Sequence, residues 1–568
     1  MPADAPAKDR AAPDRAAEAP QAPGTVRILP LGGLGEVGMN AMAVDAGSDV
    51  IVIDCGVKFP DRPLGADVMH PNFAWLEENR ARVRAVVLTH GHEDHVGALP
   101  YLLSRMNVPV YGPPYALTIA TDRLREHQTP KPDLRPLRVG ESVHIGAFKV
   151  EPIRVTHSIA DATALLLQTP AGQIIHTGDF KIDGASPDGA VFDEARFRRA
   201  GDEGVRLLMS DSTNSWVEGE TGSEQKVWES LEKNIVDFDQ RIVATVFASN
   251  VHRLIALGAV AEKTGRSICL LGRSVRKHFD AAIEHKFLKD YRHLLVTPVQ
   301  AMGLPRGNVL AIATGTQGEA RAALSRLARG DHHEFTLDPG DRVLLSARVI
   351  PGNDIAVFRM INDLLRRGID VRMPMEQRGL HVSGHAHRGE QRRMIDLVRP
   401  QAFLPVHGTL LQLKRHEELA REMGVKETLV VENGTIVEVG DAPMRRAGNF
   451  ETGIIYANGP REIDPAILDA RSALAEAGFA TVSVAVDDQF EAVGFPEVQS
   501  YGVVTGPDGG KTLDSAADFV LDEIDALPRR GRNAELVRET ARSALRRYLF
   551  RHLGIKPITS AVVMEIDA

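Results

Sequence analysis

The chain has 568 residues, of which 43% are hydrophobic and 25% charged, and its formal net charge is −9. This length predicts several domains, and this composition is typical of globular proteins. The negative net charge does not favour a nucleic-acid-binding protein, although a local basic channel remains compatible with it. No apolar run reaches the roughly 18 residues that a membrane span needs, so we expect no membrane contact.

The N-terminal tail and the cysteines indicate the compartment. Residues 1–24 are rich in Ala and Pro and lack the apolar core of a secretion signal, so we expect a disordered tail. Cys55 and Cys269 cannot form a disulfide framework, and both lie in apolar runs. We therefore expect inert thiols in the core and a cytoplasmic protein.

A glycine-rich segment follows the first strand-like run, residues 26–31. Gly33 to Gly38 satisfy the G-x-G-x-x-G pattern of dinucleotide-binding folds, and Asp54 lies about 20 residues further on, as such a fold requires. However, no helix follows the glycines. Residues 39–54 instead predict a β-hairpin, which excludes a dinucleotide-binding fold.

The most informative segment is His90-Gly-His-Glu-Asp-His95, with three imidazoles and two carboxylates in six residues. It lies between a predicted strand at 84–89 and a predicted helix start at 96–103. Because alternate residues of an extended segment point the same way, His90 and His92 can face one metal ion. Asp94 and His95 can reach a second. Imidazole and carboxylate together suit zinc and related divalent ions.

Further candidate ligands follow other strand-like runs. His157 ends the run 148–157, Asp179 follows the run 172–176, and His407 ends the run 402–407. Each residue alone would more often be a structural loop or turn residue. Together with the six-residue motif, they predict one metal site assembled from several strand ends.

The middle of the chain has a different pattern. Helices are predicted at 224–238 and 250–263, and buried strands at 241–247, 267–271, 309–313 and 342–346. This alternation predicts a parallel α/β layer. Near the C-terminus we expect a helix at 534–553 and a last strand near 558–566. The basic cluster at 529–532 is expected to be a solvated loop rather than an RNA contact.

The ligand pattern resembles that of the metallo-β-lactamase superfamily, and other segments narrow the resemblance to its β-CASP branch and to the bacterial ribonuclease J family. The six-residue motif alone indicates only the superfamily. The further segments occur in the family's order; they are residues 31–40, 54–60, 177–181, 210–214, 247–250, 314–319, 381–386 and 405–408. Residues 549–557 and 562–566 also resemble the family's C-terminal domain.

The resemblance implies an α/β fold, in which an αββα sandwich carries an inserted β-CASP domain and a small C-terminal α/β domain follows. The implied ranges are 25–223 and 380–448 for the sandwich, 224–379 for the insertion, 449–475 for a linker and 476–568 for the C-terminal domain. The insertion explains how His407 can join a site that begins at His90.

The resemblance also implies the roles of the site residues. Two divalent metal ions per chain, zinc above all with manganese or magnesium as alternatives, are held by His90, His92, Asp94, His95, His157, Asp179 and His407. Catalytic roles fall to His385, Asp211 and Asp94, with His385 as the proton donor. Substrate binding is expected at Ser249, Asn250, His381, Val382, Ser383, Gly384 and His385. His381, His387 and Asn250 could instead cap or brace a loop.

The implied function is that of a ribonuclease in RNA maturation and decay. It would degrade 5′-monophosphorylated single-stranded RNA from 5′ to 3′ and also cleave internally, with a hydroxide bridging the metals as the nucleophile. A homodimer or homotetramer and partners in RNA decay are expected. Three alternatives remain open: a DNA-processing nuclease of the β-CASP group, a small-molecule metallohydrolase, and a non-catalytic subunit of an RNA-decay complex.

Overall fold

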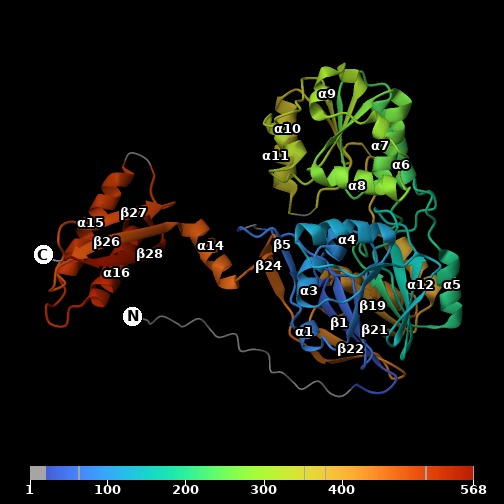
Figure 1. Cartoon of the computed structure of the whole chain (residues 1–568), viewed down its shortest axis with the longest axis horizontal. Coiled ribbons are helices and arrows are strands. Elements are labelled where there is room, and N and C mark those ends of the chain that lie inside the picture. The colour runs from blue at the N-terminus through green and yellow to red at the C-terminus, as the bar shows by residue number, and fades with distance from the viewer. Residues whose placement is uncertain (1–20, 62–63, 351, 378, 506–507, 567–568) are drawn as a thin grey trace. The chain divides into compact units, whose positions relative to one another are not determined.

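The computed structural model describes residues 21–61, 64–350, 352–377, 379–505 and 508–566. These residues form two compact units (Figure 1). The first contains a two-sheet sandwich with an inserted α/β domain, and the second contains a C-terminal domain that begins at Arg461. Within the described ranges, no helix is both long and apolar enough to cross a membrane.

The first sheet of the sandwich has eight strands in the order β23-β22-β1-β3-β4-β6-β7-β8. The hairpin predicted over residues 39–54 is confirmed, because β3 and β4 pair antiparallel with Met42 opposite Ile53. The bounds are β1 Val26–Gly32, β3 Ala41–Asp45, β4 Val50–Ile53, β6 Val83–Val87, β7 Val110–Gly112, β8 Leu134–Pro136, β22 Thr435–Val439 and β23 Arg445–Asn449.

The second sheet has seven strands in the order β21-β19-β13-β12-β11-β10-β9. Their bounds are β9 Val143–Ile145, β10 Phe148–Arg154, β11 Thr163–Thr169, β12 Gly172–His176, β13 Val205–Asp211, β19 Ala402–Val406 and β21 Glu427–Thr428. Two further pairings involve short strands: β2 (Leu34–Gly35) pairs with β20 (Gly408–Thr409), and β5 (Val68–Pro71) pairs with β24 (Ile454–Asn458).

The two sheets pack face to face, as the resemblance predicts. Ile28 and Val44 of the first sheet share one fully buried cluster with Val150, Leu207 and Leu404 of the second. This burial supplies the hydrophobic driving force that holds the layers together. The helices of the sandwich are α1 Ala74–Glu78, α2 Glu93–Val96, α3 Leu99–Arg105, α4 Pro114–Glu126, α5 Glu194–Glu203, α12 Arg388–Val398 and α13 Leu410–Glu422.

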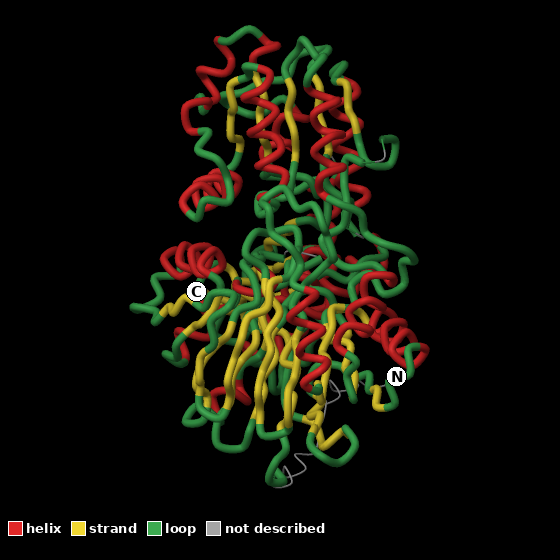
Figure 2. Tube along the Cα trace, turned by 90° about the vertical axis from the view of Figure 1, so that its right-hand side faces the viewer, coloured by secondary structure: helices red, strands yellow, loops and turns green. Residues whose placement is uncertain are grey.

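The inserted domain, Glu224–Arg372, confirms the predicted parallel layer. Its five strands are all parallel, in the order β15-β16-β14-β17-β18, and Figure 2 shows them flanked by helices. The strands are β14 Ile242–Thr245, β15 Ser267–Leu271, β16 Val309–Ala313, β17 Arg342–Leu345 and β18 Asp370–Arg372. The helices are α6 Glu224–Ile235, α7 Val251–Thr264, α8 Arg273–Glu284, α9 Pro298–Gly303, α10 Ala323–Arg329 and α11 Asp354–Arg366, with 3₁₀ turns at Arg292–Leu294 and Arg306–Asn308.

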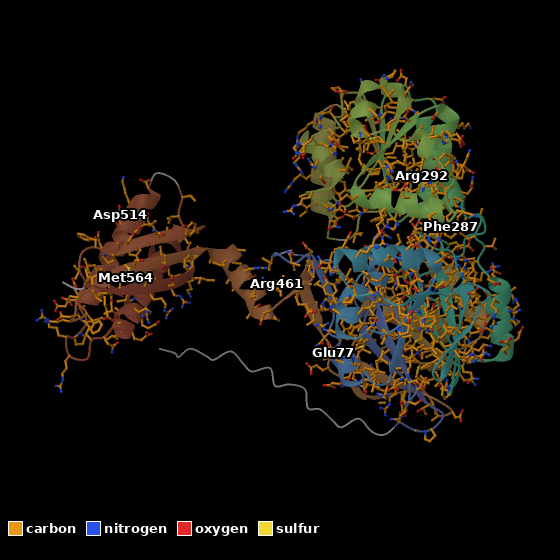
Figure 3. All side chains as sticks on the ribbon, in the orientation of Figure 1. Glu77, Phe287, Arg292, Arg461, Asp514 and Met564 are labelled. Carbon is orange, nitrogen blue, oxygen red and sulfur yellow. The ribbon has the colours of Figure 1, made fainter. Side chains whose placement is uncertain are left out.

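The inserted domain contacts the sandwich through α8 and the segment after it. Phe287, labelled in Figure 3, lies edge-on to Tyr115 of α4 with ring centroids 5.8 Å apart. The Tyr115 hydroxyl lies 3.0 Å from Nδ1 of His278, and the Thr118 hydroxyl lies 2.7 Å from Nε2 of His285. These contacts fix one side of the inserted domain against the layer that carries the first ligand motif.

The C-terminal domain packs two helices on one face of a three-stranded sheet. Its strands, in the order β27-β26-β28, are β26 Phe479–Val486, β27 Glu497–Tyr501 and β28 Ile558–Glu565, and its helices are α15 Gly509–Asp525 and α16 Ala534–Leu553. The predicted last helix and strand are confirmed. Residues 449–475 carry β24, β25 (Arg461–Ile463) and the start of α14 (Pro465–Ala477); the domain boundaries stay predictions.

The turn that carries Asp94 and His95 differs from the prediction. The helix predicted at 96–103 is α3, which begins at Leu99, and a separate short helix that was not predicted, α2 (Glu93–Val96), precedes it and carries both residues. Gly56 packs directly beneath this turn, because a Cβ at Gly56 would lie 1.6 Å from the carbonyl oxygen of Asp94. No L side chain fits there without moving the backbone.

Gly56→Ala is therefore expected to destabilise the sandwich by about 3 kcal/mol, because overpacking against the backbone cannot be relieved by a rotamer change. The Tm should fall by roughly 6–12 °C for a domain of this size. Gly303→Ala is the matched control, since a Cβ at Gly303 would meet nothing within 4 Å. Equal melting temperatures for the two variants would contradict the packing.

Candidate metal centre

The candidate ligands converge because their strands end at the same edge of the sandwich. In the second sheet, β12, β13 and β19 are parallel neighbours, and β10 runs in the same direction because β11 is antiparallel to both β10 and β12. In the first sheet, β4 and β6 are parallel. The loops after these strands carry His90, His157, Asp179 and His407, so residues more than 300 positions apart meet in one place.

The first ligand group contains His90, His92, His157 and Asp179. Nδ1 of His92 lies 3.1 Å from Nε2 of His90 and 3.1 Å from Nε2 of His157. Both of those Nε2 atoms lie 3.7 Å from Oδ2 of Asp179. The predicted pairing of His90 with His92 from an extended segment is present.

The second ligand group contains Asp94, His95, Asp179 and His407. Nε2 of His95 lies 3.1 Å from Oδ2 of Asp179 and 3.7 Å from Oδ2 of Asp94. His407 places Nε2 3.6 Å from Asp94 and Nδ1 2.9 Å from Asp179. Asp179 therefore belongs to both groups and lies between them.

The donor atoms fit divalent metal ions. Ligand nitrogens bonded at about 2.0–2.1 Å to a tetrahedral ion lie roughly 3.3 Å apart, close to the separations of the His92 ring from its neighbours. Nε2 of His407 is buried and has no hydrogen-bond partner among the described residues. Such an orphaned buried nitrogen is costly unless something binds it.

Burial and charge divide the imidazoles into two kinds. Burial holds the pKa of His90 and of His157 well below the usual value, so both rings are neutral, which is the metal-binding form. For His95 and His407, burial opposes the charged form, but Asp179 and the neighbouring carboxylates together more than offset it, and each pKa lies well above the usual value. Carboxylates that attract a proton this strongly also attract a cation.

Several residues that orient the ligands had no role in the sequence prediction. Asp54 accepts hydrogen bonds from Nδ1 of His95 at 2.8 Å and from the Thr89 amide at 2.7 Å. Nδ1 of His157 donates to the carbonyl of Gly384 at 2.7 Å. Such partners fix the tautomer and orientation of a ligating imidazole. The available signal was the position of Asp54 at the end of a buried strand.

His385 and Asp211 lie beside the ligand groups. Nδ1 of His385 is 2.8 Å from Oδ2 of Asp211, and both residues can form a third group with Asp179 and His407. Burial opposes protonation of His385, but the Asp211 and Asp179 carboxylates outweigh it, so its pKa is raised. The imidazole can therefore carry a proton beside the ligand groups.

The loop 381–386 is braced from several sides. The Ser383 hydroxyl oxygen accepts from Asn214 Nδ2 at 2.9 Å and from the His385 amide at 3.1 Å, so its own proton is free to donate. A Cβ at Gly384 would lie 2.9 Å from the His157 ring, so this close approach requires glycine. Asn214 is a further brace that the sequence prediction did not assign.

The remaining predicted substrate-binding residues differ in whether they already contact other parts of the protein. The Asn250 side chain caps α7 by accepting from the Arg253 amide at 3.1 Å, so its oxygen is already used. Ser249 is half-buried, and its hydroxyl has no partner within the described part of the chain. His381 and Val382 both contact the Arg253 guanidinium.

Four family models match the chain. They are the metallo-beta-lactamase superfamily at residues 34–232, the ribonuclease J beta-CASP domain at 239–364, the Zn-dependent metallo-hydrolase RNA specificity domain at 368–431 and the ribonuclease J C-terminal domain at 466–566. Their order confirms the predicted fold class. The metallo-hydrolase models together with the His/Asp groups indicate divalent metal binding.

Curated relatives match over most of the chain. Ribonuclease J from Sinorhizobium meliloti is 35% identical over 95% of this chain and 97% of the relative. Ribonuclease J 1 from Streptococcus pyogenes is 35% identical over 96% and 98%, and ribonuclease J from Mycobacterium tuberculosis is 36% identical over 89% and 91%.

Among solved structures, a protein of unknown function from Enterococcus faecalis V583 matches with a TM-score of 0.53 and 18% identity. The match covers 73% of this chain and 100% of that chain, and it supports the fold alone. The sequence matches go further, because they span all of the predicted domains. The chain belongs to the ribonuclease J family and is a metal-dependent ribonuclease that acts on RNA.

Proposed function

We propose that the chain binds two divalent ions, one in each ligand group. His90, His92 and His157 hold the first, Asp94, His95 and His407 hold the second, and Asp179 bridges them. The observation that carries this proposal is the position of Asp179 in both groups. The nitrogen-rich donor set favours zinc, and manganese is the alternative. Bound together, two such ions activate water and stabilise charge at phosphorus.

His385 is proposed as the group that gives a proton to the leaving ribose 3′ oxygen. Its hydrogen bond to Asp211 orients the ring and stabilises the protonated form. The His385 side chain is 24% exposed, so the ring can be reached by a substrate while the Asp211 hydrogen bond holds the proton in a fixed position. Because Asp211 keeps Nδ1 engaged, Nε2 is the nitrogen left to face the substrate.

We propose 5′-to-3′ degradation of monophosphorylated RNA together with internal cleavage. The Ser383 hydroxyl and the Gly384 amide supply donors for one phosphate, with the Ser249 hydroxyl as a further donor. Glycine at 384 lets the backbone approach a phosphate closely. A triphosphate brings more charge and length than these few donors can satisfy.

The alternatives are less well supported. A non-catalytic subunit would lack ligands, whereas all seven predicted ligands lie in the two groups. A small-molecule hydrolase would not need the inserted domain or the RNA specificity segment at residues 368–431. A DNA nuclease would need to tolerate the absence of the 2′-hydroxyl, and a direct comparison of RNA with single-stranded DNA tests this.

We further propose that the enzyme works in the cytoplasm in RNA maturation and decay, as a homodimer or homotetramer with RNA-decay partners. The buried cysteines Cys55 and Cys269 are compatible with a reducing compartment. Burial raises the pKa of the Cys269 thiol to about 12, so this thiol is unreactive at neutral pH.

The first functional prediction concerns metal content. Purified protein should carry about two divalent ions per chain by elemental analysis, as expected for a paired site, and strong chelation should abolish RNA cleavage. Asp94→Ala should lose at least one ion, because it removes a carboxylate from the second group. Full metal content and full activity in this variant would refute the assignment.

The second prediction separates His385 from the metal ligands. His385→Ala should lower turnover roughly 10²–10⁴-fold, the contribution of a positioned acid, while metal content stays unchanged. The exposed His333 provides the matched control, and His333→Ala should retain full turnover. Loss of metal from His385→Ala would instead make this residue a ligand.

The third prediction concerns the 5′ end. RNA with a labelled 5′ monophosphate should release mononucleotides from that end, and triphosphorylated RNA should be attacked from the end slowly. Ser249→Ala combined with Ser383→Ala should weaken the monophosphate preference more than internal cleavage, which need not fill the pocket. Equal 5′-end degradation of both RNAs, or shortening from the 3′ end, would contradict the proposal.

A further inference from the structure

A fully buried arginine of the inserted domain holds the loop that carries His385. Arg253 lies on α7 and is 1% exposed. Its Nη2 donates to Nδ1 of His381 at 2.9 Å and to the carbonyl of Val382 at 3.1 Å. Its Nη1 donates to the carbonyl of Ser346, just after β17. One guanidinium therefore joins the inserted domain to the segment that returns to the sandwich.

The charge of Arg253 is balanced inside the protein. Oε1 of Glu224, at the start of α6, lies 3.3 Å from Nη2, and both side chains are 1% exposed. Burial disfavours the charged carboxylate, but the charges of Arg253 and Lys181 and the hydrogen bond from Arg253 together outweigh this effect and lower the pKa of Glu224. The pair is therefore ionised, and the planar guanidinium directs its remaining donors at fixed acceptors.

The contact with His381 determines where that ring carries its proton. A guanidinium only donates, so Nδ1 of His381 must accept, and the proton of the neutral ring lies on Nε2. Burial, together with the nearby Arg253 charge, holds the pKa of His381 well below the usual value, which keeps the ring neutral. His381 thus presents one N–H donor, two residues before Ser383.

We propose that Arg253 is a positioning residue that holds His381 as a neutral Nε2–H donor and fixes the backbone at Val382, so that the phosphate donors and His385 are correctly placed. The inference rests on the proposed function of this loop. Arg253 itself is buried behind the loop and acts through His381 and Val382.

The experiment uses full-length protein carrying Arg253→Lys. Lysine keeps a positive charge beside Glu224 but cannot reach Ser346 and the loop at the same time. The matched control is Arg266→Lys, because Arg266 is also a buried arginine of the inserted domain, 3% exposed, that donates to backbone carbonyls of Gln240, Val309 and Phe238. It has no hydrogen bond to the loop 381–385 within the described ranges.

Two substrates distinguish an effect on the loop from an effect on the metal site. Monophosphorylated RNA needs the loop, whereas bis(4-nitrophenyl) phosphate has no terminal phosphate and a leaving group that needs no acid. We expect Arg253→Lys to lower kcat/KM for the RNA about 10²-fold, the effect of a displacement of roughly 1 Å. Hydrolysis of the nitrophenyl ester and metal content should stay at wild-type levels, and Arg266→Lys should leave all three measurements unchanged.

A double variant tests whether Arg253 acts through His381. If Arg253 acts through His381, the loss in Arg253→Lys with His381→Ala should be smaller than the product of the two single losses. Multiplicative losses, wild-type RNA activity in Arg253→Lys, or parallel loss of metal and nitrophenyl ester hydrolysis would each overturn the inference. Failure of the proposed function differs, because the wild-type protein itself would then not discriminate between 5′ ends.

Discussion

The site depends on one buried carboxylate, that of Asp179, which can interact with more than one metal ion or protonated imidazole. Asp179 is 2% exposed and belongs to all three candidate ligand groups. A charge of this kind is too costly to bury without partners, and the partners come from the ends of different strands in both sheets. The folded sandwich is therefore required to assemble them, and the convergence of strand ends is the structural basis of the metal chemistry.

The second constraint is the segment that leads from the inserted domain back to the sandwich. The chain leaves the second sheet after β13, forms the inserted domain, and returns through residues 380–387 to β19. This return segment carries His385, whose carbonyl accepts hydrogen bonds from Asn214 at 3.0 Å and Thr221 at 3.2 Å. The buried Glu390 carboxylate accepts from the amides of Ile182, Thr221 and His387, each at 2.9 Å. A dense polar network of this kind fixes one geometry.

Much of the fold and of the site could be predicted from sequence, for identifiable reasons. The strands at 267–271 and 309–313 agree with β15 and β16 because both are short runs that are almost entirely apolar, and the helix at 534–553 agrees with α16 because Asn533 and Gly554 mark its ends. The ligand motif was recognisable because its residue types are rarely clustered without a cation. The short helix α2 could not be recognised from the sequence, because a helix of four residues shows too little periodicity to reveal where it begins.

The interactions that orient the site could not be predicted, because they join residues with no local relation in sequence. Arg253 and His381 are 128 positions apart, and His157 and Gly384 are 227 apart. Asp54 and His407 also adopt left-handed backbone conformations, with φ of 58° and 52°, which non-glycine residues rarely tolerate. Surrounding structure must enforce such strain. The ligands can thus be recognised in the sequence from their residue types. Their exact orientation, in contrast, depends on long-range contacts and backbone strain that are present only in the folded chain.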